Sequence, residues 1–226
     1  MSLNLENFKK VSDKSKNCTF AYLRRVENKY CIDIPMVIFQ ICTLFYFSFD
    51  EWDRDWTHEA YTIDQKAQTI KQTSDGNGSP EFLLQTVNDG IHSWKFKILA
   101  RVSPIWGLTR FGIVINDEKI LSKATNGGKS FGTISNTAYV WECVYTSKVI
   151  QHNNSRRWGK LYGRKCKQGD AISMKLDFVK STLSFSINDQ DQGIAHDIDH
   201  NNAYRAAVAL QRIGDELALL SYEQIA

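Results

Sequence analysis

The chain has 226 residues, a length at which a β-sandwich can form a single domain whose core needs no metal or disulfide. Its 28 Lys and Arg residues nearly balance its 25 Asp and Glu residues, and the net charge of +3 argues against nucleic acid or an anionic membrane as the default partner. The five cysteines are widely spaced and form no Cys-x-x-Cys pair, so we expect reduced thiols in a cytoplasmic protein and no zinc site.

The first part of the chain is a predicted N-terminal extension. Residues 1–30 are polar and lack a hydrophobic period, which predicts a loosely ordered lead-in without a signal-peptide core. Residues 31–60 are a predicted helical extension, whose helix over 34–47 carries apolar side chains at helical spacing after a capping Asp33. We expect this helix to pack on the following domain or on another chain. Its apolar run is shorter than the roughly 18 residues that cross a bilayer, so no membrane partner is expected.

From residue 61 onward the hydrophobic period changes to two. Apolar and polar side chains alternate in short segments, which Gly, Asn and Asp turns separate without helical crossovers. This pattern predicts an all-β domain over 61–226, an antiparallel two-sheet β-sandwich. Tyr139 and Trp141 are expected in its core, and Val140 and Glu142 alternate with them. The predicted strands are 82–87, 94–98, 111–115, 139–144, 172–178, 183–187, 205–210 and 216–222, with a turn at 188–193.

The segment 158–198 resembles the second half of a SPRY domain. In that family a Gly-Asp pair opens a strand that ends in Leu-Asp, a short turn leads to a strand that ends in Asn, and a Gly then begins the next strand. Upstream, residues 90–98 match the family's Gly-x-x-x-Trp strand, and downstream, residues 204–210 resemble its Tyr-Pro-x-Val strand, with Arg205 in place of the proline. The helical extension is similar to one found before SPRY-like domains in some protist proteins. The residues that carry the resemblance are Gly90, Trp94, Gly169, Asp170, Leu176, Asp177, Phe185, Asn188 and Gly193.

The resemblance to SPRY domains, which extends over 63–222, implies a concanavalin-like jelly roll that binds a protein or peptide through loops at the sandwich edge and is not an enzyme. The chain is then expected to be an interaction module or an adaptor subunit of a larger assembly. Three long connections, 99–110, 116–137 and 145–167, can supply such loops. The candidate partner-binding residues are Trp106 and Arg110 as an anchor pair, Arg156, Arg157 and Trp158 in a basic aromatic loop, and Gln211 and Arg212 between the last two strands.

Two other functions stay open at this point. Nucleic-acid binding through the basic aromatic loop 156–167 is the first alternative, although the nearly neutral chain disfavours it. A sugar-binding or glycosidase sandwich is the second. It is disfavoured because Glu51 and Asp53, which have the alternating spacing of a carboxylate pair, precede the predicted sandwich.

The sequence predicts no catalytic, metal or cofactor site. The acidic stretch 50–55 lacks the glycine and the glutamate that a calcium loop requires. His196 and His200 lie four residues apart, but their segment is predicted to be a strand end and a solvated turn, not a helix that would align them. No nucleophile stands in a catalytic context, and no glycine-rich loop precedes a helix.

Overall fold

The computed structural model describes residues 52–56, 58–75, 81–102, 109–121, 138–143, 147–151 and 159–225. The predicted lead-in at 1–30 and the predicted helix at 34–47 lie outside the described residues. Among the residues that are described, no helix is both long enough and apolar enough to span a membrane.

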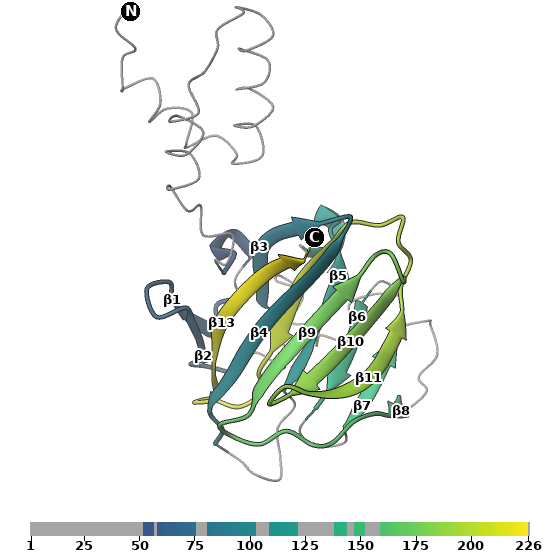
Figure 1. Cartoon of the computed structure of the whole chain (residues 1–226). Helices are drawn as coiled ribbons and strands as arrows, with labels where there is room; N and C mark the ends of the chain where they lie inside the picture. Colours follow the sequence, from purple (N-terminus) through teal and green to yellow (C-terminus); the bar gives the residue numbers. More distant parts are fainter. Residues whose placement is uncertain are drawn as a thin grey trace, which may run out of the picture. The chain divides into compact units, whose positions relative to one another are not determined.

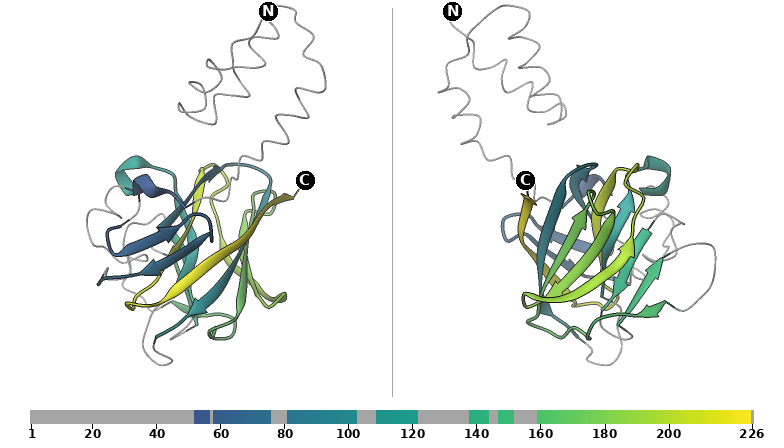
Figure 2. Two further views of the ribbon diagram at one scale, coloured as in Figure 1. Left: turned by 90° about the vertical axis from the view of Figure 1, so that its left-hand side faces the viewer. Right: turned by 45° about the vertical axis from the view of Figure 1, so that its right-hand side comes forward.

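Two antiparallel sheets make up the described domain (Figure 1), which confirms the predicted fold class. The seven-stranded sheet has the order β1 (Tyr61–Asp64), β2 (Thr69–Gln72), β13 (Glu216–Ile225), β4 (Ile91–Ala100), β9 (Ala171–Asp177), β10 (Thr182–Ile187) and β11 (Gln190–Asp197). The six-stranded sheet has the order β3 (Glu81–Val87), β12 (Tyr204–Ala209), β5 (Arg110–Ile115), β6 (Ala138–Glu142), β7 (Lys148–Gln151) and β8 (Lys160–Leu161). A short 3-10 helix, η1 (Arg54–Trp56), precedes β1, and the β1–β2 hairpin lies beside β13 (Figure 2).

The β9–β10 hairpin shows how the sequence specifies the sheet. Its alternation is complete, because Ile172, Met174 and Leu176 are buried while the residues between them face away from the core. In the following turn, which joins β10 to β11, Asn188 and Asp189 both have positive φ, at 50° and 62°. This is the backbone conformation of the two-residue hairpin turns whose twist matches that of the strands. The predicted turn at 188–193 is therefore shorter than expected, and pairing resumes at once with β11.

The main core lies between the two sheets. Trp94 and Phe96 of β4 meet Phe111 of β5 and Trp141 of β6, and the predicted burial of Tyr139 and Trp141 is confirmed. Val140 and Glu142 alternate with these two residues along β6, but all five residues of the strand are buried, so its other face is covered as well. Val140 belongs to a second apolar cluster on the opposite face of the six-stranded sheet, together with Leu121.

The packed domain includes described residues that precede the predicted boundary at residue 61. Trp52 is buried in the main core, with its ring centroid 6.3 Å from that of Phe96. The next residue, Asp53, forms an ion pair with Arg205 of β12, at the position where the SPRY family usually has proline. The described residues 52–56 and 58–60 therefore pack with the sandwich.

Candidate functional site

Four strand ends meet at the lower end of the sandwich in Figure 1. Ala209 of β12 pairs with Arg110 of β5, and Glu216 of β13 pairs with Ala100 of β4, so the chain segments that leave these strands emerge together. We call the surface formed there by Arg101, Val102 and residues 211–215 the loop-end surface. It contains the described parts of two connections that the sequence singled out, namely the segment after β4 and the loop between the last two strands.

Hydrogen bonds from the backbone to Asp215 hold the loop-end surface in place. The Oδ1 atom of Asp215 accepts from the Val102 N–H at 2.9 Å, and its Oδ2 atom accepts from the Arg212 N–H at 3.2 Å. Burial raises the pKa of Asp215, although these hydrogen bonds oppose the shift. The Gly214 N–H also donates to the Gln72 carbonyl at 2.8 Å. The β12–β13 loop is thus tied both to the segment after β4 and to β2.

The β12–β13 loop and the segment after β4 each present an aliphatic side chain to solvent. Val102 is 61% exposed and Ile213 is 58% exposed. Gly214 lies between the loop and Val102: its φ is +97°, and a Cβ atom at this position would be only 2.7 Å from Val102 Cγ2. Only glycine fits there without displacing Val102, because it has no Cβ and tolerates positive φ. The loop therefore brings Gly214, the residue after the exposed Ile213, close to Val102 from a distant part of the chain.

The structure places three of the predicted site residues. Gln211 is half-buried and Arg212 is exposed, and both lie in the β12–β13 loop where the sequence expects them. Arg110 does not lie in a loop as predicted, because it is the first residue of β5. The other predicted site residues, Trp106, Arg156, Arg157 and Trp158, lie outside the described residues.

Arg110 is a buried structural residue, which corrects the prediction that it is a loop anchor for a partner. It pairs with Glu142 across β5 and β6, with Arg110 Nη2 and Glu142 Oε2 3.2 Å apart. The two side chains are only 10% and 7% exposed. Burial lowers the pKa of Arg110, and the neighbouring Glu142 carboxylate opposes this change. Because its guanidinium is occupied beneath the surface, Arg110 is not available as an interface anchor.

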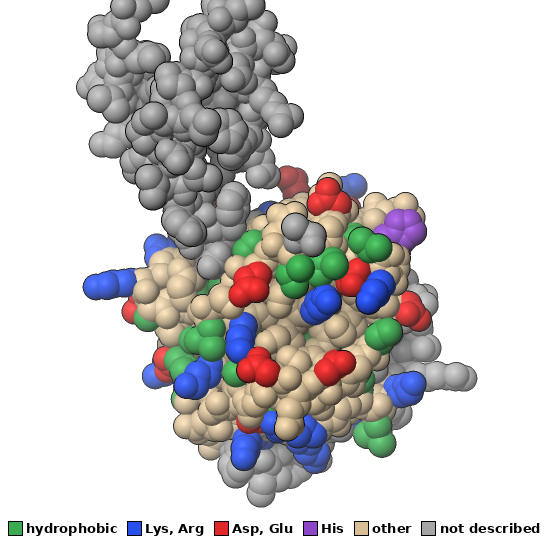
Figure 3. All heavy atoms as spheres, in the orientation of Figure 1, with side chains coloured by type: hydrophobic (Ala, Val, Ile, Leu, Met, Phe, Trp, Pro, Cys, Tyr) green, Lys and Arg blue, Asp and Glu red, His purple; other side chains and the backbone are tan. Residues whose placement is uncertain are grey.

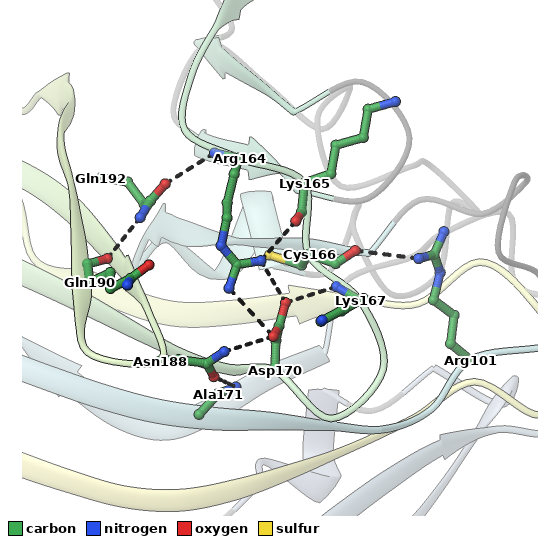
Figure 4. Close-up of polar contacts among 10 residues, drawn as sticks. All are labelled: Arg101, Arg164, Lys165, Cys166, Lys167, Asp170, Ala171, Asn188, Gln190 and Gln192. Atoms are coloured by element: carbon green, nitrogen blue, oxygen red, sulfur yellow. Dashed lines mark hydrogen bonds and ion pairs between the residues drawn. The ribbon is translucent and has the colours of Figure 1, made fainter.

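Part of the predicted basic aromatic loop is also structural (Figure 4). Arg164 Nη1 lies 2.9 Å from Asp170 Oδ2, and its Nη2 lies 3.4 Å from Oδ1. Asp170 also accepts from the Lys167 N–H at 3.0 Å and from Asn188 Nδ2 at 2.8 Å. Burial raises the pKa of Asp170, but the hydrogen bonds from Arg164, Lys167 and Asn188 outweigh it, so the net pKa is lowered. Tyr162 is anchored as well, because its hydroxyl donates to the Gly193 carbonyl at 2.5 Å.

Two further described cations of this segment lie near the loop-end surface. Arg101 Nη1 donates to the Cys166 carbonyl at 3.3 Å, which ties the segment 163–170 to the loop-end surface (Figure 4). Lys165 and Lys167, on either side of Cys166, are exposed. With Arg212, they add exposed positive charge to this end of the sandwich.

The sequence predicts a strand end and a solvated turn at His196 and His200, and the structure places His196 in the strand but not in contact with solvent. It lies on β11, only 5% of it is exposed, and its Nε2 atom is 3.1 Å from the Val140 carbonyl of the opposite sheet. Because a carbonyl only accepts, Nε2 carries the proton that is donated. Burial lowers the pKa of His196 to about 4, so the ring is neutral at neutral pH. Within the described ranges, no group of three or more His, Cys, Asp and Glu side chains is placed to hold a metal ion.

No family model matches the sequence, and no curated protein matches it. Among solved structures, the SPRY domain of human HERC1 is similar to this chain with a TM-score of 0.55 and 17% identity, covering 74% of this chain and 96% of that one. The PSpry domain of TRIM65 has a TM-score of 0.54 and 15% identity, covering 76% and 91% of the two chains. The NHR1 domain of Drosophila melanogaster neuralized has a TM-score of 0.50 and 13% identity, covering 76% and 97%. The described domain is therefore a β-sandwich with the SPRY fold, as the sequence predicts.

Proposed function

We propose that this chain is a non-catalytic protein-interaction module, or an adaptor subunit, that recognises a protein or peptide through its loop-end surface. The observation that carries the proposal is the exposure of Val102 and Ile213 on two segments that a hydrogen bond between the Val102 N–H and Asp215 ties together. The SPRY fold supports it, because the resemblance to that family implies recognition through edge loops. No cofactor is needed for such a role, and a cytoplasmic location remains a prediction.

The energetics of the loop-end surface suit an interface. Burying an exposed aliphatic side chain completely is worth about 1.5–3 kcal/mol, and a surface that is already ordered loses little further conformational entropy when it binds. The surrounding cations, Arg212, Lys165 and Lys167, add attraction toward an acidic partner and mainly increase the rate of association. We therefore expect a partner segment with an apolar anchor next to acidic side chains.

The test is capture of the partner by the full chain and by a double variant, Val102→Asp with Ile213→Asp. The matched control is Val179→Asp, because Val179 is 81% exposed in the turn between β9 and β10, away from the loop-end surface. We expect the double variant to lose proteins that the wild type and the control both capture from a native extract. Thermal unfolding of all three chains checks that the fold is retained. Equal capture by the folded double variant would contradict the proposal.

The two alternative functions have weaker support. Nucleic-acid binding through 156–167 would have one cation fewer than the sequence suggests, because Arg164 is paired with Asp170. Binding of RNA at low salt, with affinity that falls steeply as salt is added, would favour it. Sugar binding would be favoured by reproducible hits on a glycan array.

A further inference from the structure

Two cysteines of the described part of the chain are neighbours in the folded domain. Cys143 directly follows β6, and Cys166 lies in the segment that leads into β9. Both are free thiols, and they are only 0% and 2% exposed. The Cys166 N–H donates to the Cys143 carbonyl at 2.8 Å. The fold therefore brings together two thiols that are far apart in the sequence.

The register of the neighbouring strands places these cysteines opposite each other. The Tyr162 N–H donates to the Ser147 carbonyl at 2.9 Å, in the same antiparallel register as the β7–β8 pairing. Cys143 lies four residues before Ser147, and Cys166 lies four residues after Tyr162, so they are opposed positions of that register. Opposed residues that are hydrogen-bonded in this way have Cα atoms about 5.5 Å apart, within the roughly 4.4–6.8 Å that a disulfide spans.

The two thiols differ in their surroundings, and Cys143 is the less reactive one. Burial raises the pKa of the Cys143 thiol, and its interaction with the Cys166 side chain raises it further, while the positive charge of Arg101 opposes the shift. Cys143 is therefore protonated at neutral pH. A protonated thiol is a poor nucleophile toward an oxidant.

Cys166 is the thiol closer to solvent and to positive charge. It lies between the exposed Lys165 and Lys167, and its side chain lies beside the Arg164 guanidinium (Figure 4). Figure 3 shows basic side chains at the lower end of the visible face, where this segment leads into β9. Cysteines that react with oxidants are found in electropositive surroundings. An oxidant is therefore expected to react with Cys166 first.

We propose that Cys143 and Cys166 form a redox-active dithiol that hydrogen peroxide converts into a disulfide. The Cys166 sulfur attacks one peroxide oxygen, the O–O bond breaks, and water leaves as Cys166 becomes a sulfenic acid. The Cys143 sulfur then attacks the Cys166 sulfur, the S–O bond breaks, and a second water leaves. Each thiol loses one proton and one electron, and the peroxide is reduced to two waters.

The disulfide would join the two ends of the connection 145–167, which the sequence analysis singled out as a possible ligand loop. Arg101, at the loop-end surface, also bonds to the Cys166 carbonyl, so the site lies next to that surface. Closing a chain segment covalently stabilises the folded state, because it restricts the unfolded chain. This inference goes beyond the proposed function and does not depend on a partner.

Disulfide mapping of the full chain tests the dithiol without any partner. The reduced protein is treated with a stoichiometric amount of hydrogen peroxide, and mass spectrometry of a non-reducing digest identifies the linkages. We expect a linkage between Cys143 and Cys166 that dithiothreitol reverses, and a Tm about 5–10 °C higher for the oxidised chain. The matched control Cys18→Ser is expected to form the same linkage. Linkage of Cys166 to a different cysteine, or no oxidation of the folded chain, would overturn the inference.

Trapping of the sulfenic acid distinguishes a redox role from a merely structural one. In Cys143→Ser the oxidised Cys166 has no thiol to react with, so dimedone is expected to label Cys166 strongly. Labelling of Cys166 in the wild type should be much weaker, and Cys166→Ser should leave Cys143 unlabelled. Thermal unfolding checks that each variant is folded, and if Cys143→Ser does not fold, the linkage map of the wild type decides. Equal labelling of Cys166 in the wild type and in folded Cys143→Ser would contradict the proposal.

Discussion

Arg110 and Glu142 face each other across β5 and β6 as a buried ion pair. The pair joins the first residue of β5 to the last residue of β6, and Arg110 is also opposite Ala209, the last residue of β12 before the β12–β13 loop. Its role is to fix the strand ends from which the exposed loops start.

Removing one member of this pair is expected to be strongly destabilising. In Arg110→Met the Glu142 carboxylate stays buried without its cation, which costs about 3–5 kcal/mol of unfolding free energy. The double variant Arg110→Met with Glu142→Leu removes both charges and is expected to recover most of that loss. Urea unfolding of the two single variants and the double variant measures the coupling. Additive losses would show that the two side chains do not act as a pair.

The contacts of Asp170 predict a pH-dependent contribution to stability. Its pKa is lower in the folded chain than in the unfolded chain, so its contribution is complete above the unfolded value of about 4 and is lost as the pH falls further. We expect Asp170→Asn to be less stable than the wild type at pH 7, and the difference to shrink below pH ~4. Unfolding free energies at a series of pH values measure this, and a constant difference would contradict it.

His196 predicts a different pH window. Since its folded pKa is about 4 and the unfolded value is 6.5, the unfolded chain takes up the proton first as the pH falls. The wild type is therefore expected to lose stability between pH 6.5 and pH 4, by at most about 1.4 kcal/mol per pH unit from this residue. In His196→Gln this contribution to the dependence of the unfolding free energy on pH should be absent. Parallel slopes for the two chains would show that His196 is protonated equally in both states.

Gly214 predicts a link between backbone conformation and partner binding. Gly214→Ala combines a positive φ with a Cβ that meets Val102, whereas Gly169→Ala has a similar φ of +87° with no atom within 4 Å of the added Cβ. Each is expected to lose about 1–3 kcal/mol from backbone strain. Only the Gly214 variant should also weaken partner capture, because it displaces Val102. Equal effects of both variants on capture would argue against this contact.

The sequence predicts the two-sheet architecture well where the period-two alternation is unbroken, as in β9 and β10. It predicts only part of β11, a strand that begins at Gly193, because residues 190–192 are polar and the pairing with β10 is interrupted by register shifts near Ser184. It does not indicate that an apolar cluster that includes Leu121 covers the outer face of β6. Neither the bulges nor this cover can be read from local periodicity.

The candidate site is less predictable than the fold for a related reason. Arg110 looks like a surface cation until its pairing with Glu142, 32 residues away, is known. Val102 was not identified, because a single valine after a strand gives no sign of exposure. Its contact with Gly214 joins segments that only the folded sheet brings together. The β12–β13 loop was identified through the resemblance to SPRY domains, and its physical basis, the bonds to Asp215, emerges only from the structure.

Site-directed photo-crosslinking tests the loop-end surface most directly. The crosslinker p-benzoylphenylalanine is placed at Val102, at Ile213 or, as a control of similar exposure, at Val179, and the full chain is irradiated in a native extract. We predict that Val102 and Ile213 give crosslinks to the same protein and that Val179 does not. Crosslinks to that protein from Val179 alone, or no protein crosslinks from either loop-end position, would contradict recognition through the loop-end surface.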